Sequence, residues 1–139
     1  MTVTPLILLP PSEGKASGGM GPPISLDSMS FPSLNTTRSL LIRALDEINS
    51  SQNTAQKLLG VKGKALLNAM SANSKIESSS TMPAISRYTG VMYDAIEYES
   101  LNKKQMKDFN DNVLIMSGLF GIVRPLDMIP GYKLKMGAR

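Results

Sequence analysis

Two short aliphatic runs of the sequence lead directly into residues that can bind an anion. PPSEGK follows Leu6–Leu9, and SGLFG follows Val113–Met116. If the two runs are neighbouring parallel strands, these loops meet at the carboxyl ends of the strands, where open α/β sheets bind ligands. The loops then offer hydroxyl groups, backbone N–H groups and a cation to a phosphate or carboxylate. The residues concerned are Ser12, Lys15, Ser117 and Gly118. An alternative of equal weight is that both loops are only tight turns.

A second candidate lies in Arg124-Pro125-Leu126-Asp127, where a cation and a carboxylate stand three residues apart across a proline that fixes the turn. We favour an ion pair that locks this turn. The functional alternative is that this segment lines the same anion-binding cleft as the two loops, with the arginine binding phosphate through two hydrogen bonds. The cleft would then also contain Arg124, Asp127, Lys133, Lys135 and Arg139.

The segment LLGVKGKALLNAM, residues 58–70, has the outline of a helix-hairpin-helix DNA-binding unit. In such a unit, a glycine-containing turn donates backbone N–H groups to phosphates while lysines neutralise charge, so binding is independent of base sequence and sensitive to salt. The predicted contact residues are Lys57, Gly60, Val61, Lys62, Gly63 and Lys64. The alternative stays open, because the GVKG spacing is wider than the common G-x-G and glycine is frequent between any two short helices.

The elements that position these residues follow from the apolar pattern. Leu6–Leu9, stopped by two prolines, predicts a strand buried on both faces in the centre of a sheet, and Val113–Met116 predicts a second strand. Helical spacing predicts helices over 37–48, 54–59, 63–70 and 100–110, and one that starts within 87–96. Thr37 and Ser100 are the expected N-caps. The polar run 71–80 predicts an exposed loop, and alternation over 132–136 predicts a third extended piece.

These elements predict one mixed α/β domain over residues 1–139. We expect a partly parallel sheet flanked by helices, with a helix-hairpin-helix-like insertion over about 37–72. Two or three strands are few for a sheet of this kind, which usually holds about four to six, so the sheet is expected to be incomplete.

Composition excludes several classes of chemistry. The chain has no cysteine, histidine or tryptophan, which excludes thiol peroxidases, Cys/His zinc sites, His- or Cys-ligated haem and Ser-His-Asp triads. We find no catalytic constellation and expect no metal and no cofactor. The net charge of +4 favours anionic partners. The sequence contains no apolar stretch of about 20 residues, so we predict no membrane association.

Three blocks of the sequence together resemble the YaaA family. They are LILLPPSEGK (residues 6–15), YTGVMYDAI (88–96) and SGLFGIVRPLDMIPGYKLKMG (117–137). Members of that family are longer, so the resemblance implies that this chain is the N-terminal portion of a YaaA-type domain. It also implies a cytoplasmic protein of the hydrogen-peroxide response that limits iron-mediated damage, with a helix-hairpin-helix that binds double-stranded DNA. No established reaction comes with the resemblance, and an enzyme or a binding protein for small anions remains the alternative.

Overall fold

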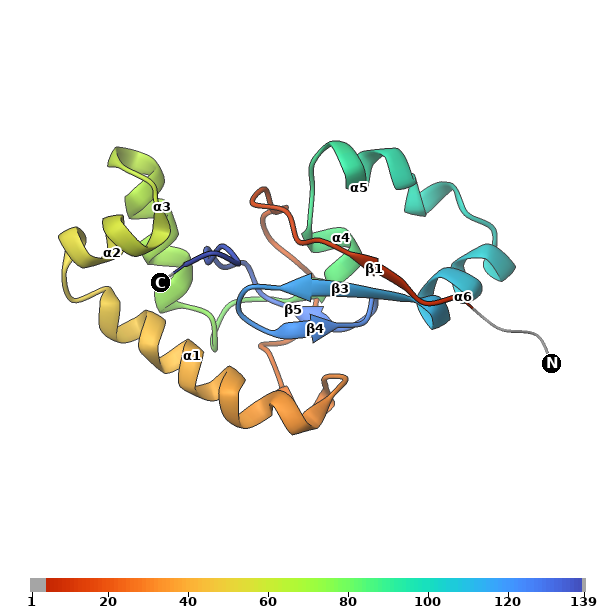
Figure 1. Ribbon diagram of the computed structural model, residues 1–139, viewed down its shortest axis with the longest axis horizontal. Helices are drawn as coiled ribbons and strands as arrows, with labels where there is room; N and C mark the ends of the chain where they lie inside the picture. Colours follow the sequence, from red (N-terminus) through yellow and green to blue (C-terminus); the bar gives the residue numbers. More distant parts are fainter. Residues whose placement is uncertain (1–4, 139) are drawn as a thin grey trace.

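β3 (Val113–Ser117) is the middle strand of a three-stranded sheet in the computed structural model, which describes residues 5–138. β1 (Ile7–Leu9) pairs with it in parallel, and β4 (Gly121–Val123) pairs with it in antiparallel orientation (Figure 1). The predicted parallel pair is therefore confirmed. The prediction that the first run is the central strand is wrong, because β1 lies at the edge of the sheet, with Ile7 47% and Leu8 57% exposed.

Two further strands form a separate pair. β2 (Met82–Pro83) and β5 (Met128–Ile129) run antiparallel, with Met82 opposite Ile129. The extended piece expected over residues 132–136 forms no strand. Its backbone is held instead by a side chain of a helix, described below.

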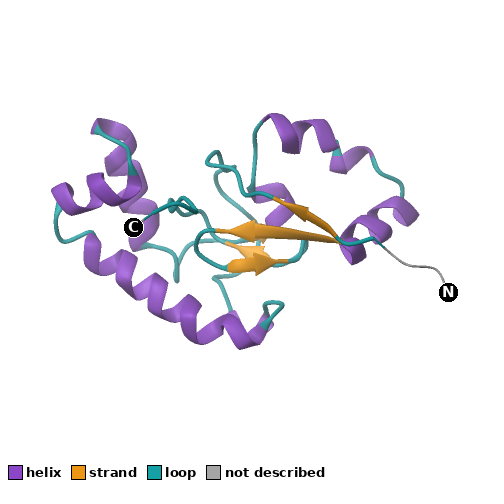
Figure 2. Ribbon diagram, in the orientation of Figure 1, coloured by secondary structure: helices purple, strands orange, loops and turns teal. Residues whose placement is uncertain are grey.

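Helices lie on both sides of the sheet and make the fold the predicted mixed α/β type (Figure 2). One group, on one side, contains α1 (Asn35–Ile48), α2 (Gln52–Leu59) and α3 (Gly63–Ser74). The remaining helices are α4 (Ala84–Arg87), α5 (Val91–Ile96) and α6 (Lys103–Asn112), and α5 and α6 lie toward the opposite end of the molecule from α2 and α3 (Figure 1). Short 3₁₀ turns occur at Leu26–Ser28, Pro32–Leu34 and Tyr98–Ser100.

The helix ends follow capping chemistry that the sequence only partly predicts. Neither Thr37 nor Ser100 is an N-cap. Helix α1 begins two residues before Thr37, at Asn35, and α6 is capped by Asn102, which forms a reciprocal capping box with Gln105. Helix α2 ends as expected at Gly60, which has a left-handed φ of 70°.

Helix α3 continues to Ser74, through residues that were expected to form an exposed loop. The polar run is helical there because Leu66, Ala69 and Asn73 are buried along one face of the helix. Asn73 is only 2% exposed and makes the contact that fixes residue 133. The polar composition of residues 71–74 concealed this inward-facing side chain.

Two buried arginines hold the loops to the sheet, each 1% exposed. Arg38 of α1 donates hydrogen bonds to the backbone carbonyls of Phe120, in the β3–β4 turn, and Ile122, in β4 (2.9 Å each), and to the carbonyl of Ser30. Arg87 of α4 donates to the carbonyls of Ala16 (2.6 Å), Gly18 (2.9 Å), Ser80 (3.2 Å) and Ile129 (3.2 Å). The long loop after β1 is therefore fastened at residues 16–18 by a charged side chain.

Candidate anion-binding cleft

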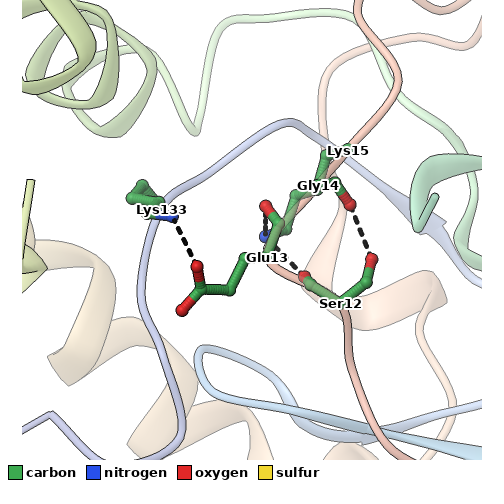
Figure 3. A network of polar contacts seen from close by, with 5 residues as sticks. All are labelled: Ser12, Glu13, Gly14, Lys15 and Lys133. Carbon is green, nitrogen blue, oxygen red and sulfur yellow. Dashed lines mark hydrogen bonds and ion pairs between the residues drawn. The ribbon is translucent and has the colours of Figure 1, made fainter. Parts of the chain in front are cut away.

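The loop after β1 is a tight turn held by its own side chains. Ser12 Oγ donates to the carbonyl of Gly14 (2.6 Å) and accepts from the N–H of Thr89 (3.1 Å). The ammonium group of Lys15 donates to the carbonyls of Ser12 (3.3 Å) and Glu13 (3.5 Å), as Figure 3 shows. The hydroxyl of Ser12 is thus used to shape the turn that presents Lys15.

Lys15 is half-buried against aromatic rings. Its Nζ lies 4.3 Å from the ring centre of Tyr132 and 5.5 Å from that of Tyr88, at distances that give cation–π attraction. Burial, and after it the positive charge of Lys133, lowers the pKa of Lys15 to about 8. The carboxylate of Glu13 acts in the opposite direction, and Arg87 adds a small lowering.

Lys15 lines a cavity of about 280 Å³, which is also lined by Lys133 and Lys135. Within it, Lys133 Nζ lies 3.6 Å from Glu13 Oε2 and points toward it (Figure 3). The cavity is lined by Pro11, Ser12, Glu13, Lys15, Lys133, Leu134, Lys135 and Met136. Three lysines and one glutamate among the lining residues make this cavity attractive to a phosphate or carboxylate.

Ser117 lies behind the cavity and does not line it. Its Oγ accepts from the N–H of Phe120 (3.0 Å) and shares a hydrogen bond with the hydroxyl of Tyr132 (2.8 Å). Tyr132 in turn shares a hydrogen bond of 2.6 Å with the hydroxyl of Tyr88. Burial raises the pKa of both phenols, so they stay neutral at ordinary pH. Ser117 therefore positions Tyr132, which faces Lys15.

Gly118 allows the cleft segment to approach the sheet. A Cβ atom at this position would lie 2.5 Å from the carbonyl oxygen of Leu134, closer than real Cβ contacts allow. Lys133, which precedes Leu134 in the chain, is held by helix α3. The side chain of Asn73 donates to the Lys133 carbonyl (2.9 Å) and accepts from the Lys133 N–H (2.8 Å). A glycine and an asparagine together fix where the lysines of residues 132–136 stand.

Arg124 and Asp127 lie at a different place, and neither lines the cavity. Asp127 accepts a hydrogen bond from the backbone N–H of Arg124 (2.8 Å) and two from Ser30 (3.0 Å each). The carboxylate thus locks the turn through the backbone N–H of Arg124, and the predicted ion pair with the Arg124 side chain is wrong. The guanidinium of Arg124 lies 5.3 Å from the ring of Phe31. Arg139 lies outside the described residues.

The helical hairpin stands next to the cavity. Gly60 and Gly63, at the two ends of its turn, both have positive φ values, of 70° and 59°. The Nζ of Lys135 lies 3.1 Å from the position that a Cβ on Gly60 would take. The side chains of the hairpin that carry positive charge, Lys57, Lys62 and Lys64, are all exposed. Lys135 therefore joins the hairpin turn to the cavity.

The fold and this surface define a mixed α/β protein in which a helical hairpin and a lysine-lined cleft adjoin. No helix within residues 5–138 combines the length and the apolar character needed to cross a bilayer. The sequence matches the family described as peroxide stress protein YaaA over residues 6–139. A UPF0246 protein of Corynebacterium efficiens is 42% identical over 134 residues, one of Corynebacterium glutamicum is 40% identical over 134, and one of Streptomyces coelicolor is 36% identical over 135.

The chain belongs to the YaaA family, also described as UPF0246. Each of these alignments covers 96% of the chain and 52% of the relative, so the chain spans about half the length of the curated relatives it matches. The family identified from the three sequence blocks is confirmed.

Proposed function

We propose that this protein acts in the peroxide-stress response by binding duplex DNA through its phosphates and so limiting iron-mediated oxidative damage. The observation that supports the proposal is the position of Lys135 Nζ, 3.1 Å from where a Cβ on Gly60 would lie, because it brings a lysine of the cleft close to the hairpin turn. The family's description as a peroxide stress protein supports the physiological part.

The hairpin supplies contacts that suit a phosphate backbone. Lys62 and Lys64 flank Gly63, the first residue of α3, and no side chain caps that end of the helix. Backbone N–H groups at the start of a helix favour anions, and the two exposed lysines add positive charge. Contacts of this kind recognise phosphate spacing, so the proposed binding is independent of base sequence.

Neutralising DNA phosphates gives a physical route to limiting iron damage. Duplex DNA holds a condensed layer of cations, and a protein that neutralises phosphates with lysines releases them. Ferrous ions in that layer would be displaced from the DNA together with the other cations. Protection of the covered DNA by this route would not require a metal site on the protein.

A charge-reversal experiment tests the proposal. We expect the double variant Lys62→Glu/Lys64→Glu to lose most of its affinity for a duplex of arbitrary sequence in fluorescence anisotropy. The matched control reverses Lys103 and Lys104, two exposed lysines of α6, which lies at the opposite end of the molecule from the hairpin (Figure 1). Equal losses in both variants, or none in the hairpin variant, would reject the hairpin as the contact surface.

The cavity supports a second candidate function, the binding of a small phosphate or carboxylate compound. Its support is the convergence of Lys15, Lys133 and Lys135 on one cavity of about 280 Å³. Inorganic phosphate should then perturb Lys15 and Lys133 in NMR spectra, and Lys133→Ala should weaken that binding several-fold. Equal perturbation of all surface lysines would remove this candidate.

A further inference from the structure

The surroundings of Lys15 favour a reaction of its side-chain amine as a nucleophile. It lies in a cavity, and its ammonium group is flanked by the face of Tyr132 at 4.3 Å and by two backbone carbonyls at 3.3 and 3.5 Å. A lysine amine becomes a nucleophile toward carbonyl compounds when it is desolvated or placed next to another cation. Both conditions hold here. Burial desolvates the Lys15 amine, and a second cation, Lys133, lines the same cavity.

We propose that Lys15 forms an imine with an aldehyde that carries a neighbouring phosphate ester. The aldehyde carbon reaches Lys15 Nζ while the phosphate is held by Lys133 and Lys135 at the mouth of the cavity. Two sources share this chemistry: the ring-opened sugar of an abasic site in DNA, and a free sugar phosphate. The DNA source rests on the duplex binding proposed above, whereas the free sugar phosphate does not.

The reaction balances without any oxidant or reductant. The lone pair of the neutral amine attacks the aldehyde carbon, a C–N bond forms, and the carbonyl oxygen takes up a proton to give a carbinolamine. Loss of water then leaves a C=N bond between Lys15 and the former aldehyde carbon. Amine and aldehyde thus give imine and one water molecule. The carbonyls of Ser12 and Glu13 accept N–H groups of Lys15 and orient the amine.

Burial and the positive charges of Lys133 and Arg87 favour the free amine of Lys15. The carboxylate of Glu13 and the ring faces of Tyr88 and Tyr132 favour its protonated form, and the net effect is a lowered pKa. Because its pKa is lowered to about 8, Lys15 presents a far larger share of neutral amine near neutral pH than an ordinary lysine does. The neighbouring phenols stay neutral, because burial raises the pKa of both.

Cyanoborohydride trapping tests the proposal, since it converts an imine into a stable secondary amine that mass spectrometry assigns to one residue. The chain is incubated at pH 7.5 with a duplex containing one abasic site, with glyceraldehyde 3-phosphate, or with glyceraldehyde. We expect the adduct at Lys15 to exceed that at Lys103, an exposed lysine of α6, at least tenfold, to be weaker with the unphosphorylated aldehyde, and to vanish in Lys15→Arg. Lys103→Arg is the matched control and should leave the Lys15 adduct unchanged.

Each outcome decides a different point. An adduct at Lys15 with the abasic duplex assigns the DNA source, and an adduct with the free sugar phosphate alone assigns the other. Adducts spread evenly over the lysines, or their absence from Lys15 with every probe, would overturn the imine proposal. Anisotropy with an intact duplex is measured in parallel, so that a lack of DNA binding is recognised separately. The proposed function survives an overturned imine if that duplex is bound.

Discussion

Gly118→Ala is the substitution that most directly tests how the cleft is positioned. The added methyl group would lie 2.5 Å from the carbonyl oxygen of Leu134, and ordinary contact begins at 3.4 Å, so the segment must move by about 0.9 Å. The three atoms nearest to the added methyl group are backbone atoms of Leu134 and Lys135, which cannot move aside as a flexible side chain could. Overpacking of this kind costs about 1–3 kcal/mol.

This loss is measurable by urea unfolding followed by circular dichroism. For a chain of this length, about 1–3 kcal/mol corresponds to a fall in Tm of roughly 3–10 °C. The control is Gly137→Ala, because a Cβ at Gly137 meets nothing within 4 Å, and it should change stability by less than about 0.5 kcal/mol. The reasoning is refuted if Gly118→Ala is as stable as the unchanged chain, or if both alanine variants lose the same amount.

Three further predictions follow from other contacts. Arg87→Lys should lower the free energy of unfolding by about 2–3 kcal/mol, because an ammonium group cannot reach carbonyls on several loops at once, while exposed Arg43→Lys should be neutral. Asn73→Ala removes both hydrogen bonds to the Lys133 backbone and should cost about 1–3 kcal/mol and weaken phosphate binding. Since folding lowers the pKa of Lys15 to about 8, the unfolded chain holds more protons above that pH, and stability should rise by about 1.4 kcal/mol per pH unit from about pH 8 toward pH 10.

Each of these three predictions can be checked with variants of this chain. The rise with pH should disappear in Lys15→Met, which should also be the more stable protein at pH 7, and an unchanged slope in that variant would contradict the assignment to Lys15. Urea curves for Arg87→Lys and Arg43→Lys that coincide would contradict the role given to the buried guanidinium. An Asn73→Ala variant with full stability would show that the 132–136 segment is held by other contacts.

The local pattern of residues in the sequence predicts which strands form better than it predicts where each strand lies in the sheet. Aliphatic runs and their flanking prolines or glycines identify β1 and β3, and the parallel pair follows from the helices between them. The edge position of β1 depends on which strand β4 joins, and that is decided by the tight turn after Ser117. No pattern within the first run contains this information.

For the candidate site too, the sequence predicts individual residues but not how they come together. The sequence predicts that Ser12 and Lys15 shape one loop, and that lysines 133 and 135 are available nearby. Their convergence depends on contacts between residues far apart in the chain, such as Asn73 with residue 133 and Gly118 with residue 134. Buried Arg38 and Arg87 were missed because arginines are seldom fully buried, and their partners are carbonyls that leave no signal in the sequence.

The salt dependence of duplex binding tests the central claim most directly. Each phosphate that a lysine neutralises contributes about −0.9 to the slope of log K against log salt concentration. We predict a steep negative slope for the chain, and a slope shallower by about 2 for Lys62→Gln/Lys64→Gln, with Lys103→Gln/Lys104→Gln unchanged. A flat slope in the unchanged chain, or the same slope in both double variants, would contradict binding through the hairpin.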